Sequence, residues 1–241
     1  MMHGQDWDGE QDLTGWIMSE KLDGFRAFWN GSNLISRTGK ILPVPAEFTH
    51  GLPSDVCLDG EIWAGYDAFS ALFSLFKTNY TGDINRWQNI KYCVFDAPMH
   101  PGNYAERHAF AVKSISSRSP HIDIIPIVHC LGLKHLQTIL NEITQRKGEG
   151  IMLYNPSAKY TSGRTPNLLK VKVAEEEDVK FIKLNPNSYS FLCEQQNGVQ
   201  CVVKCSGWEY SFPPSPGATL TVKHHGLSLA SQKMKYPFLI K

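Results

Sequence analysis

The segment Ser19-Glu20-Lys21-Leu22-Asp23-Gly24-Phe25-Arg26 is the stretch on which the interpretation of this chain depends. Lys21 lies among strand-like apolar residues and precedes an Asp-Gly turn, so we expect the backbone to fix its position. An amine held in a dry site near other cations loses its proton more readily and can act as a nucleophile. Because Lys-x-Asp-Gly is a short pattern that often arises by chance, its partners along the chain decide the matter.

Two further lysines suit a site that binds phosphate. In Leu168-Leu169-Lys170-Val171-Lys172 the lysines are two residues apart, so both project from one face of a strand. In that position they would bind a phosphate and disfavour protonation of Lys21. A solvated strand face explains the same pattern, and the sequence leaves both interpretations open.

Carboxylates for a divalent cation and for a sugar hydroxyl are available in Asp59-Gly60-Glu61 and at Glu149. An exposed loop is the ordinary place for any one of these acids, and that alternative stays open. Arg37, in the segment 36–40, follows a predicted strand and lies in a turn that can present a guanidinium to a phosphate. A surface arginine is the alternative there.

One predicted strand, Tyr92-Cys93-Val94-Phe95-Asp96, carries two aromatic side chains that are out of phase. Only one of them can face a given side of a sheet. One aromatic would then stack on a purine while the other packs in the core. For any single aromatic, the core is the ordinary position.

The 241 residues suffice for one large domain, or for a medium domain and a small one. The net charge of +1 argues neither for nor against nucleic acid, but the charge is unevenly distributed. Residues 179–241 carry a net +5 and the preceding residues a net −4. A small basic C-terminal part suits a module that contacts phosphate backbones, with a lysine-rich solvated face as the alternative.

Cysteine usage and the N-terminus bear on location. None of the six cysteines shows Cys-x-x-Cys spacing, so we expect buried, reduced thiols in a reducing compartment. Cys201 and Cys205 share a face of a predicted strand, which leaves a metal or disulfide role as a weaker alternative. Residues 1–15 are acidic and polar, unlike a signal peptide, and no apolar run is long enough to span a membrane. These features predict a soluble protein in the cytoplasm, or in the nucleus of a eukaryote.

Hydrophobic patterning predicts an α+β domain with antiparallel sheets in residues 1–173. Its predicted strands cover 15–20, 25–30, 33–36, 56–63, 90–95, 151–154 and 168–173, and its predicted helices cover 68–77, 104–114 and 133–147. Asn30-Gly31 is a hairpin signal. The charged stretch 174–178 is predicted to be a linker. Four short predicted strands in 179–241 (179–184, 189–194, 199–205 and 218–224) fit a small barrel of the OB type.

Taken in order, the segments KLDGFR, SRTG, LDGEIW, YCVFD, GEGIML and LLKVK form a distinctive series. This series resembles the covalent nucleotidyltransferases, specifically the ATP-dependent DNA ligases, and in spacing and size it is most similar to the minimal bacterial ligases of the Lig E type. The resemblance extends from about Trp16 to the C-terminus. It implies an α+β nucleotidyltransferase (adenylation) domain followed by a small all-β OB-fold domain.

The resemblance also implies roles around the nucleotide. Lys21 is then the residue that becomes adenylated, and Glu20 and Leu22 flank the adenine pocket. Tyr92 is implied to stack on the base. Arg26 is implied to hold the ribose, together with Glu61.

Further implied roles concern the phosphates and the metal, which is Mg²⁺ or Mn²⁺. Glu61 and Glu149 would hold the divalent ion, and Lys170 and Lys172 would contact the α-phosphate of ATP. Arg37 is implied to bind nucleotide and to read the 5′-phosphate of a nick.

In the C-terminal part, Lys223, Lys235 and Lys241 are implied to contact DNA. Minimal ligases commonly carry arginines where Lys235 and Lys241 stand. A lysine keeps the charge but loses the two-pronged guanidinium.

The implied reaction has three steps. A lysyl-AMP forms from ATP, AMP passes to the 5′-phosphate of a nick in duplex DNA, and the 3′-hydroxyl then displaces AMP. The expected protein is a monomer with no obligate protein partner. An RNA ligase is the main alternative, although the OB-like tail favours DNA. An mRNA capping guanylyltransferase and a non-enzymatic DNA-binding protein are the others. Replication, repair and DNA uptake are not distinguished.

Overall fold

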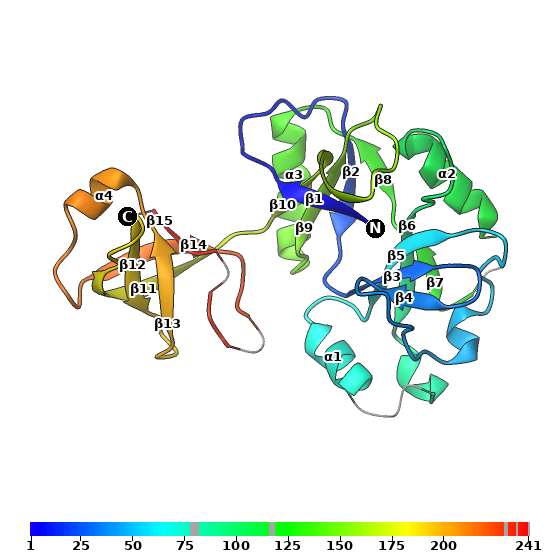
Figure 1. Cartoon of the computed structure of the whole chain (residues 1–241), viewed down its shortest axis with the longest axis horizontal. Coiled ribbons are helices and arrows are strands. Elements are labelled where there is room, and N and C mark those ends of the chain that lie inside the picture. Colours follow the sequence, from blue (N-terminus) through cyan, green and yellow to red (C-terminus); the bar gives the residue numbers. More distant parts are fainter. Residues whose placement is uncertain (78–81, 116–118, 229–230, 235, 241) are drawn as a thin grey trace. The chain divides into compact units, whose positions relative to one another are not determined.

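The computed structural model describes residues 1–77, 82–115, 119–228, 231–234 and 236–240. The chain divides into two units, Met1–Val171 and Lys172–Lys241 (Figure 1). The larger unit is built on two five-stranded sheets, and the smaller unit on a closed five-stranded barrel. The prediction of an α+β unit followed by a small all-β barrel is therefore confirmed.

The first sheet of the larger unit, which we call sheet 1, has Lys21 at the end of its β2 strand. Its strands, in spatial order, are β1 (Met2–Asp6), β10 (Gly163–Lys172), β9 (Gly150–Tyr154), β2 (Ile17–Lys21) and β8 (Ile127–His129). Strand β2 runs antiparallel to both β9 and β8, whereas β1 pairs in parallel with β10. The N-terminal residues, predicted only as a polar segment, thus form an edge strand.

The second sheet, sheet 2, has Arg26 and Glu61 on neighbouring strands. Its order is β4 (Leu34–Ser36), β3 (Phe25–Trp29), β5 (Leu58–Trp63), β6 (Lys91–Asp96) and β7 (Ile122–Ile124). The β3–β4 hairpin turns at Asn30-Gly31, as predicted: Gly31 has φ +94°, and the Asn30 carboxamide accepts two backbone N–H groups. The prediction of antiparallel sheets needs one correction, because β6–β7, like β1–β10, is parallel.

One face of sheet 2 builds the main core of the larger unit. Its buried side chains include Trp29, Leu58 and Ile62, which pack against Phe48 and Trp87. The last two come from the short helices η1 (Ala46–Thr49) and η2 (Ile84–Trp87). The opposite face of the sheet therefore remains for a site.

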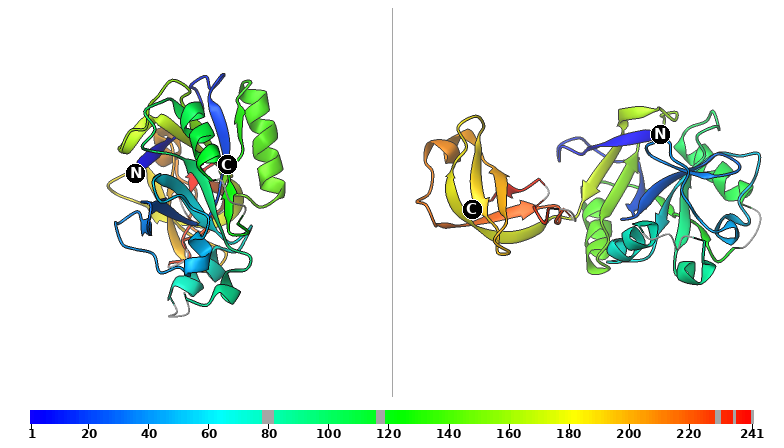
Figure 2. Two further views of the ribbon diagram at one scale, coloured as in Figure 1. Left: turned by 90° about the vertical axis from the view of Figure 1, so that its right-hand side faces the viewer. Right: turned by 60° about the horizontal axis from the view of Figure 1, so that its bottom comes forward.

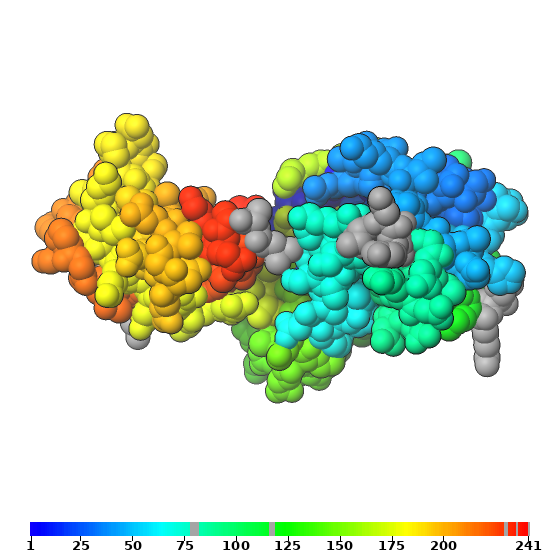
Figure 3. Space-filling view, turned by 90° about the horizontal axis from the view of Figure 1, so that it is seen from below, coloured from blue at the N-terminus to red at the C-terminus, as the bar shows by residue number. Residues whose placement is uncertain are grey.

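Three α-helices within the described ranges cover the larger unit: α1 (Phe69–Lys77), α2 (Tyr104–Ser114) and α3 (Leu133–Gln145). Helix α1 lies on the surface in Figure 3, in cyan, and its three phenylalanines surround Phe25. A capping box between Asn103 and Glu106 begins α2. The sequence placed these helices to within two residues. No helix in the described ranges is long and apolar enough to cross a membrane.

The smaller unit is a closed barrel (Figure 2). Buried residues alternate with exposed ones along parts of its strands. Its strands, in spatial order, are β11 (Glu175–Leu184), β12 (Ser190–Glu194), β13 (Gln200–Lys204), β15 (Phe238–Leu239) and β14 (Thr219–His224). A short helix, α4 (Gly207–Ser211), lies between β13 and β14. The six cysteines are free thiols, and four of them are buried, including Cys193 and Cys201 in the barrel core.

The predicted linker at 174–178 is wrong as a description of local structure. Residues Glu175 to Asp178 belong to strand β11 and pair with β14. The division between the units falls between Val171 and Lys172. The acidic run forms a strand because β14 supplies hydrogen bonds and opposite charge, as in the Glu176–Lys223 pair at 3.3 Å.

Candidate active site

Lys21 ends strand β2 opposite Gly150 of β9, and this register brings the residue before Gly150 alongside it. Lys21 Nζ lies 2.5 Å from Glu149 Oε2, with both side chains about one-fifth exposed. The chain then crosses to sheet 2 at Gly24. A Cβ at Gly24 would come within 2.2 Å of the Ile62 carbonyl oxygen, so only glycine allows this close crossing. The Asp-Gly turn thus sets Lys21 where the two sheets meet.

Arg26, two residues beyond the crossing, is held rigidly. Its Nε and Nη2 donate to the two oxygens of Asp59 at 3.1 and 2.7 Å, and Asp59 is fully buried. Its guanidinium carbon lies 5.4 Å from the centre of the Phe95 ring. Two-pronged pairing of this kind fixes the orientation of the guanidinium as well as its charge. Asp59, predicted as a possible metal or sugar ligand, is committed to Arg26 instead.

Glu61 shares a sheet face with Arg26, its direct partner across β3 and β5. Burial raises the pKa of Glu61 to about 8, and the carboxylates of Glu149 and Asp59 add to that effect. Lys21 and Arg26 oppose it but do not cancel it. Burial is the main cause of the raised pKa. Lys21 is paired with Glu149 and Arg26 with Asp59, so Glu61 is a third carboxylate beside two cations that already have partners.

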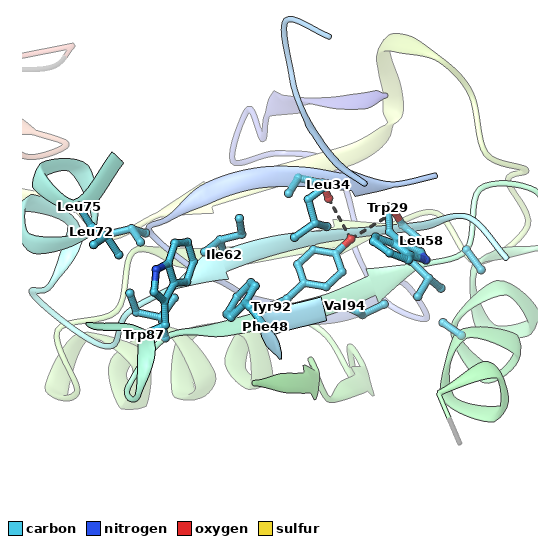
Figure 4. Close-up of a cluster of buried hydrophobic side chains, with 14 residues drawn as sticks. Trp29, Leu34, Phe48, Leu58, Ile62, Leu72, Leu75, Trp87, Tyr92 and Val94 are labelled. Atoms are coloured by element: carbon cyan, nitrogen blue, oxygen red, sulfur yellow. Dashed lines mark hydrogen bonds between the residues drawn. The ribbon is translucent and has the colours of Figure 1, made fainter. Parts of the chain in front are cut away.

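Tyr92 cannot stack on a base, so that prediction is wrong. It is fully buried in the core cluster, and its hydroxyl donates to the carbonyls of Ala27 and Leu58 (Figure 4). Phe95, out of phase with Tyr92 on the same strand, is partly exposed and lies beside Arg26. The out-of-phase pattern predicted one aromatic in the core and one outside it, and Tyr92 is the one in the core.

The Glu20 side chain points to the face opposite Lys21, as alternation along β2 requires. Its two oxygens accept from the Tyr66 hydroxyl at 2.9 Å and from Arg146 Nη2 at 3.3 Å. Leu22, partly exposed, follows Lys21 directly. Both residues therefore flank Lys21 along the chain, but the Glu20 carboxylate is already engaged.

The remaining predicted contacts of the larger unit lie on other elements than Lys21. Lys170 pairs with Asp6 of β1 at 3.5 Å, and Lys172 ends the same strand on the same face. Arg37 is exposed in the turn after β4. Burial lowers the pKa of His3 on β1, and the nearby charges of Arg26 and Arg37 lower it further.

Among the predicted DNA contacts, Lys223 lies on β14 in an ion pair with Glu176. Lys235 and Lys241 lie outside the described residues.

Two features of this site were missed from the sequence. Tyr160 donates to Asp59 Oδ2 at 2.9 Å, and Met2, on the unpredicted strand β1, donates its backbone N–H to the Tyr160 hydroxyl at 2.8 Å. No local pattern connects residues 158 positions apart. The segment YTSGR, which three residues separate from LLKVK, offered a weak signal, because a tyrosine there precedes a strand that carries predicted site residues.

The described residues contain no group of three or more His, Cys, Asp or Glu side chains that could hold a metal by themselves. Glu61 and Glu149 form a pair of carboxylates near Lys21. Such a pair fits Mg²⁺, which is usually bound by one or two carboxylates together with substrate phosphates. A cation bound there would also favour the ionised form of Glu61.

The site thus combines Lys21 paired with Glu149, Arg26 fixed by Asp59, and the carboxyl group of Glu61, which has no ion-pair partner among the described residues.

The family model for the ATP-dependent DNA ligase domain matches residues 10–172. The DNA ligase of Haemophilus influenzae is 31% identical over 229 residues, covering 90% of this chain and 83% of that protein. This chain belongs to the ATP-dependent DNA ligase family.

Solved structures agree with this family assignment. A Lig E DNA ligase has a TM-score of 0.78 and 26% identity, with 100% of this chain and 98% of that chain covered. The DNA ligase-adenylate of Chlorella virus gives a TM-score of 0.59 at 18% identity, covering 100% of this chain and 96% of that one. The second of these shows the fold alone.

Membership of the ligase family confirms several predictions. The chain is a minimal ATP-dependent DNA ligase, an enzyme that joins polynucleotides and uses ATP. Its larger unit is the nucleotidyltransferase fold and its barrel is the OB fold.

Proposed function

We propose that this ligase seals nicks between a 5′-phosphate and a 3′-hydroxyl in duplex DNA, with Lys21 as the nucleophile. The observation that carries the proposal is the position of Lys21. It ends β2 at the junction of the two sheets, 2.5 Å from Glu149 and close to the charges of Arg26 and Glu61. The reaction needs a nucleophilic amine, an acceptor for its proton, and fixed charge around a phosphate.

In the first step the lone pair of Lys21 Nζ forms a bond to the α-phosphorus of ATP. The bond from that phosphorus to the oxygen bridging to the β-phosphate breaks, and pyrophosphate leaves with the electron pair. An ammonium has no lone pair, so Lys21 must first lose a proton. Glu149 Oε2 is the nearest acceptor, and we assign it that role.

Glu61 and Glu149 are the residues that would hold Mg²⁺ or Mn²⁺. A bound divalent ion supplies positive charge to the phosphates as charge develops on the leaving pyrophosphate. Glu61 is suited to this because it has no ion-pair partner of its own among the described residues. Lys170 and Lys172 are proposed to approach the α-phosphate from β10.

Phe95, rather than Tyr92, is proposed to stack on the adenine. Its partial exposure and its place beside Arg26 support this assignment. Arg26 is proposed to contact the ribose through the edge that Asp59 leaves open. Leu22 and the backbone of Glu20 are proposed to line the pocket, since the Glu20 side chain is bound elsewhere.

In the second step, an oxygen of the 5′-phosphate forms a bond to the phosphorus of lysyl-AMP, the phosphorus–nitrogen bond breaks, and Lys21 takes up a proton and leaves as the amine. In the third step, the oxygen of the 3′-hydroxyl forms a bond to the phosphorus of the 5′-phosphate and gives up its proton, while the bond from that phosphorus to the oxygen shared with AMP breaks and AMP leaves with the electron pair. Arg37 is proposed to hold that 5′-phosphate, and Lys223, Lys235 and Lys241 to contact the duplex. We propose that a monomer suffices.

The test of the nucleophile is transfer of label from α-labelled ATP to the protein. Wild type and Lys113→Ala, which replaces an exposed lysine on α2, are expected to become labelled. Lys21→Ala is expected to remain unlabelled while keeping the far-ultraviolet circular dichroism spectrum of wild type. Labelling of Lys21→Ala at the wild-type level would refute the assignment.

The alternative of an RNA ligase is tested separately on nicked duplexes that differ only in the strand ending at the 3′-hydroxyl. We expect faster sealing of the DNA end than of the RNA end. Preferential sealing of RNA ends would favour the alternative, even with the lysyl-AMP chemistry intact.

A further inference from the structure

Tyr160 lies in the segment between β9 and β10, and its hydroxyl makes two hydrogen bonds in opposite senses. It accepts the backbone N–H of Met2 at 2.8 Å and donates to Asp59 Oδ2 at 2.9 Å. Burial and the Asp59 carboxylate both raise the pKa of Tyr160, so its proton stays available for donation. The Met2 bond also limits rotation of the hydroxyl, because a tyrosine that accepts from one side donates to the other.

Asp59 Oδ2 receives Tyr160 and Arg26 Nη2 together, while Oδ1 receives Arg26 Nε. The carboxylate is fully buried, so water cannot replace a lost donor. With three donors on two oxygens, the plane of the carboxylate is fixed, and with it the plane of the guanidinium.

The Tyr160 ring is itself held in place. The guanidinium carbon of Arg107 lies 5.7 Å from its centre. Arg107 is buried, pairs with Asp96 at 2.7 Å and donates to the Ala158 carbonyl at 3.1 Å, two residues before Tyr160. Helix α2, sheet 2 and the segment that carries Tyr160 are thus joined through one side chain.

We infer that Tyr160 is a positioning residue for the nucleotide: through Asp59 it sets the orientation in which Arg26 meets the sugar of ATP. This inference rests on the proposed function, since it assigns a second residue to the same site. It also gives strand β1 a role, because the Met2 amide orients the Tyr160 hydroxyl. Tyr160 itself touches neither the reacting phosphorus nor Lys21.

A role of this kind has a kinetic signature. If Tyr160 acts through Arg26 on the sugar, its hydroxyl should matter for binding ATP and much less for the attack by Lys21. Loss of the Tyr160 hydroxyl should also weaken the preference for ATP over its deoxy analogues, because a ribose hydroxyl improves binding only when Arg26 is correctly oriented. A tyrosine with a purely structural role would not change this preference.

The experiment measures lysyl-adenylate formation at varied ATP, 2′-deoxy-ATP and 3′-deoxy-ATP. For Tyr160→Phe we expect the KM for ATP to rise roughly three- to tenfold, as for loss of a hydrogen bond to a charged group. The rate at saturation should stay within about twofold of wild type. The advantage of ATP over at least one deoxy analogue should shrink by a similar factor. Tyr210→Phe, which removes a hydroxyl bonded to the Asn185 carbonyl in the barrel, is the matched control and should leave all three quantities unchanged.

A double-mutant cycle with Asp59→Asn decides whether the effect passes through Asp59. Adding Tyr160→Phe to Asp59→Asn should change the KM for ATP by less than about twofold. The inference is overturned by a full effect of Tyr160→Phe in that background, by an unchanged KM in the single variant, or by unchanged ratios for both analogues. If wild type itself forms no lysyl-adenylate, the proposed function fails instead.

Discussion

Replacing Glu61 with glutamine is expected to stabilise the larger unit at pH 8.5 and to leave its stability at pH 5 nearly unchanged. The pKa of Glu61 is raised from an ordinary 4.5 to about 8. The folded unit therefore binds a proton that the unfolded chain releases between these two values. Because the folded state then carries more protons, the free energy of unfolding falls as the pH rises from about 4.5 to about 8. Glutamine, always neutral, avoids this loss.

The size of this change in the free energy of unfolding follows from how far the pKa of Glu61 is raised. At about 1.4 kcal/mol for each tenfold change in proton affinity, a rise from 4.5 to about 8 sets a ceiling of about 5 kcal/mol. Glu61 is partly exposed, and screening by water removes part of this, so we expect about 2 kcal/mol at pH 8.5. At pH 5 the folded state of wild type is already neutral at this position, and the difference should be below about 0.5 kcal/mol.

Urea unfolding from pH 5 to 9, followed by tryptophan fluorescence, measures the effect. Five of the six tryptophans lie in the larger unit, so the signal reports mainly on that unit. Glu194→Gln, an exposed position in the barrel, controls for loss of one negative charge. A difference between wild type and Glu61→Gln that stays constant from pH 5 to 9 would contradict the charge imbalance at this site.

Three further outcomes can be checked with the same assays. Phe95→Leu should raise the KM for ATP several-fold with little change in stability. Tyr92→Phe should lose about 1 to 3 kcal/mol of stability and leave the KM for ATP unchanged. The reverse result would restore the original assignment of Tyr92 as the aromatic that stacks on the base. Arg107→Met should cost about 3 to 5 kcal/mol in urea unfolding, because it leaves Asp96 buried without its cation, and a loss below 1 kcal/mol would argue against a buried ion pair. Gly24→Ala should lower the melting temperature, because its Cβ would lie 2.2 Å from a carbonyl oxygen; an unchanged temperature would mean that the crossing has room to spare.

Local patterns sufficed where neighbours along the chain determine the structure. The Asn30-Gly31 hairpin and the helices at 69–77 and 104–114 follow from turn chemistry, spacing and capping. Lys21 could be singled out because its strand, its turn and its order relative to later motifs all agree. Its pairing with Glu149 bridges 128 residues and depends on the register of β2 with β9.

Other features could not be predicted because they depend on contacts between residues far apart in the sequence. Alternation shows that Tyr92 and Phe95 oppose each other, but which face is the core depends on Phe48 and Trp87, from elements elsewhere in the chain. Strand β1 is short and polar, and only its parallel partner β10 makes it a strand. The run 175–178 reads as a solvated linker until β14 is known to lie beside it.

Because residues 175–178 belong to β11, very little chain separates that strand from strand β10. Strand β10 ends at Lys172 and strand β11 begins at Glu175, so Val173 and Ala174 alone connect them. For a ligand that contacts both units, a tether this short makes the second contact an intramolecular event with a high effective concentration. A long substrate such as a duplex would then be released only when both contacts break together. Avidity of this kind would favour retention of a duplex that contacts both units.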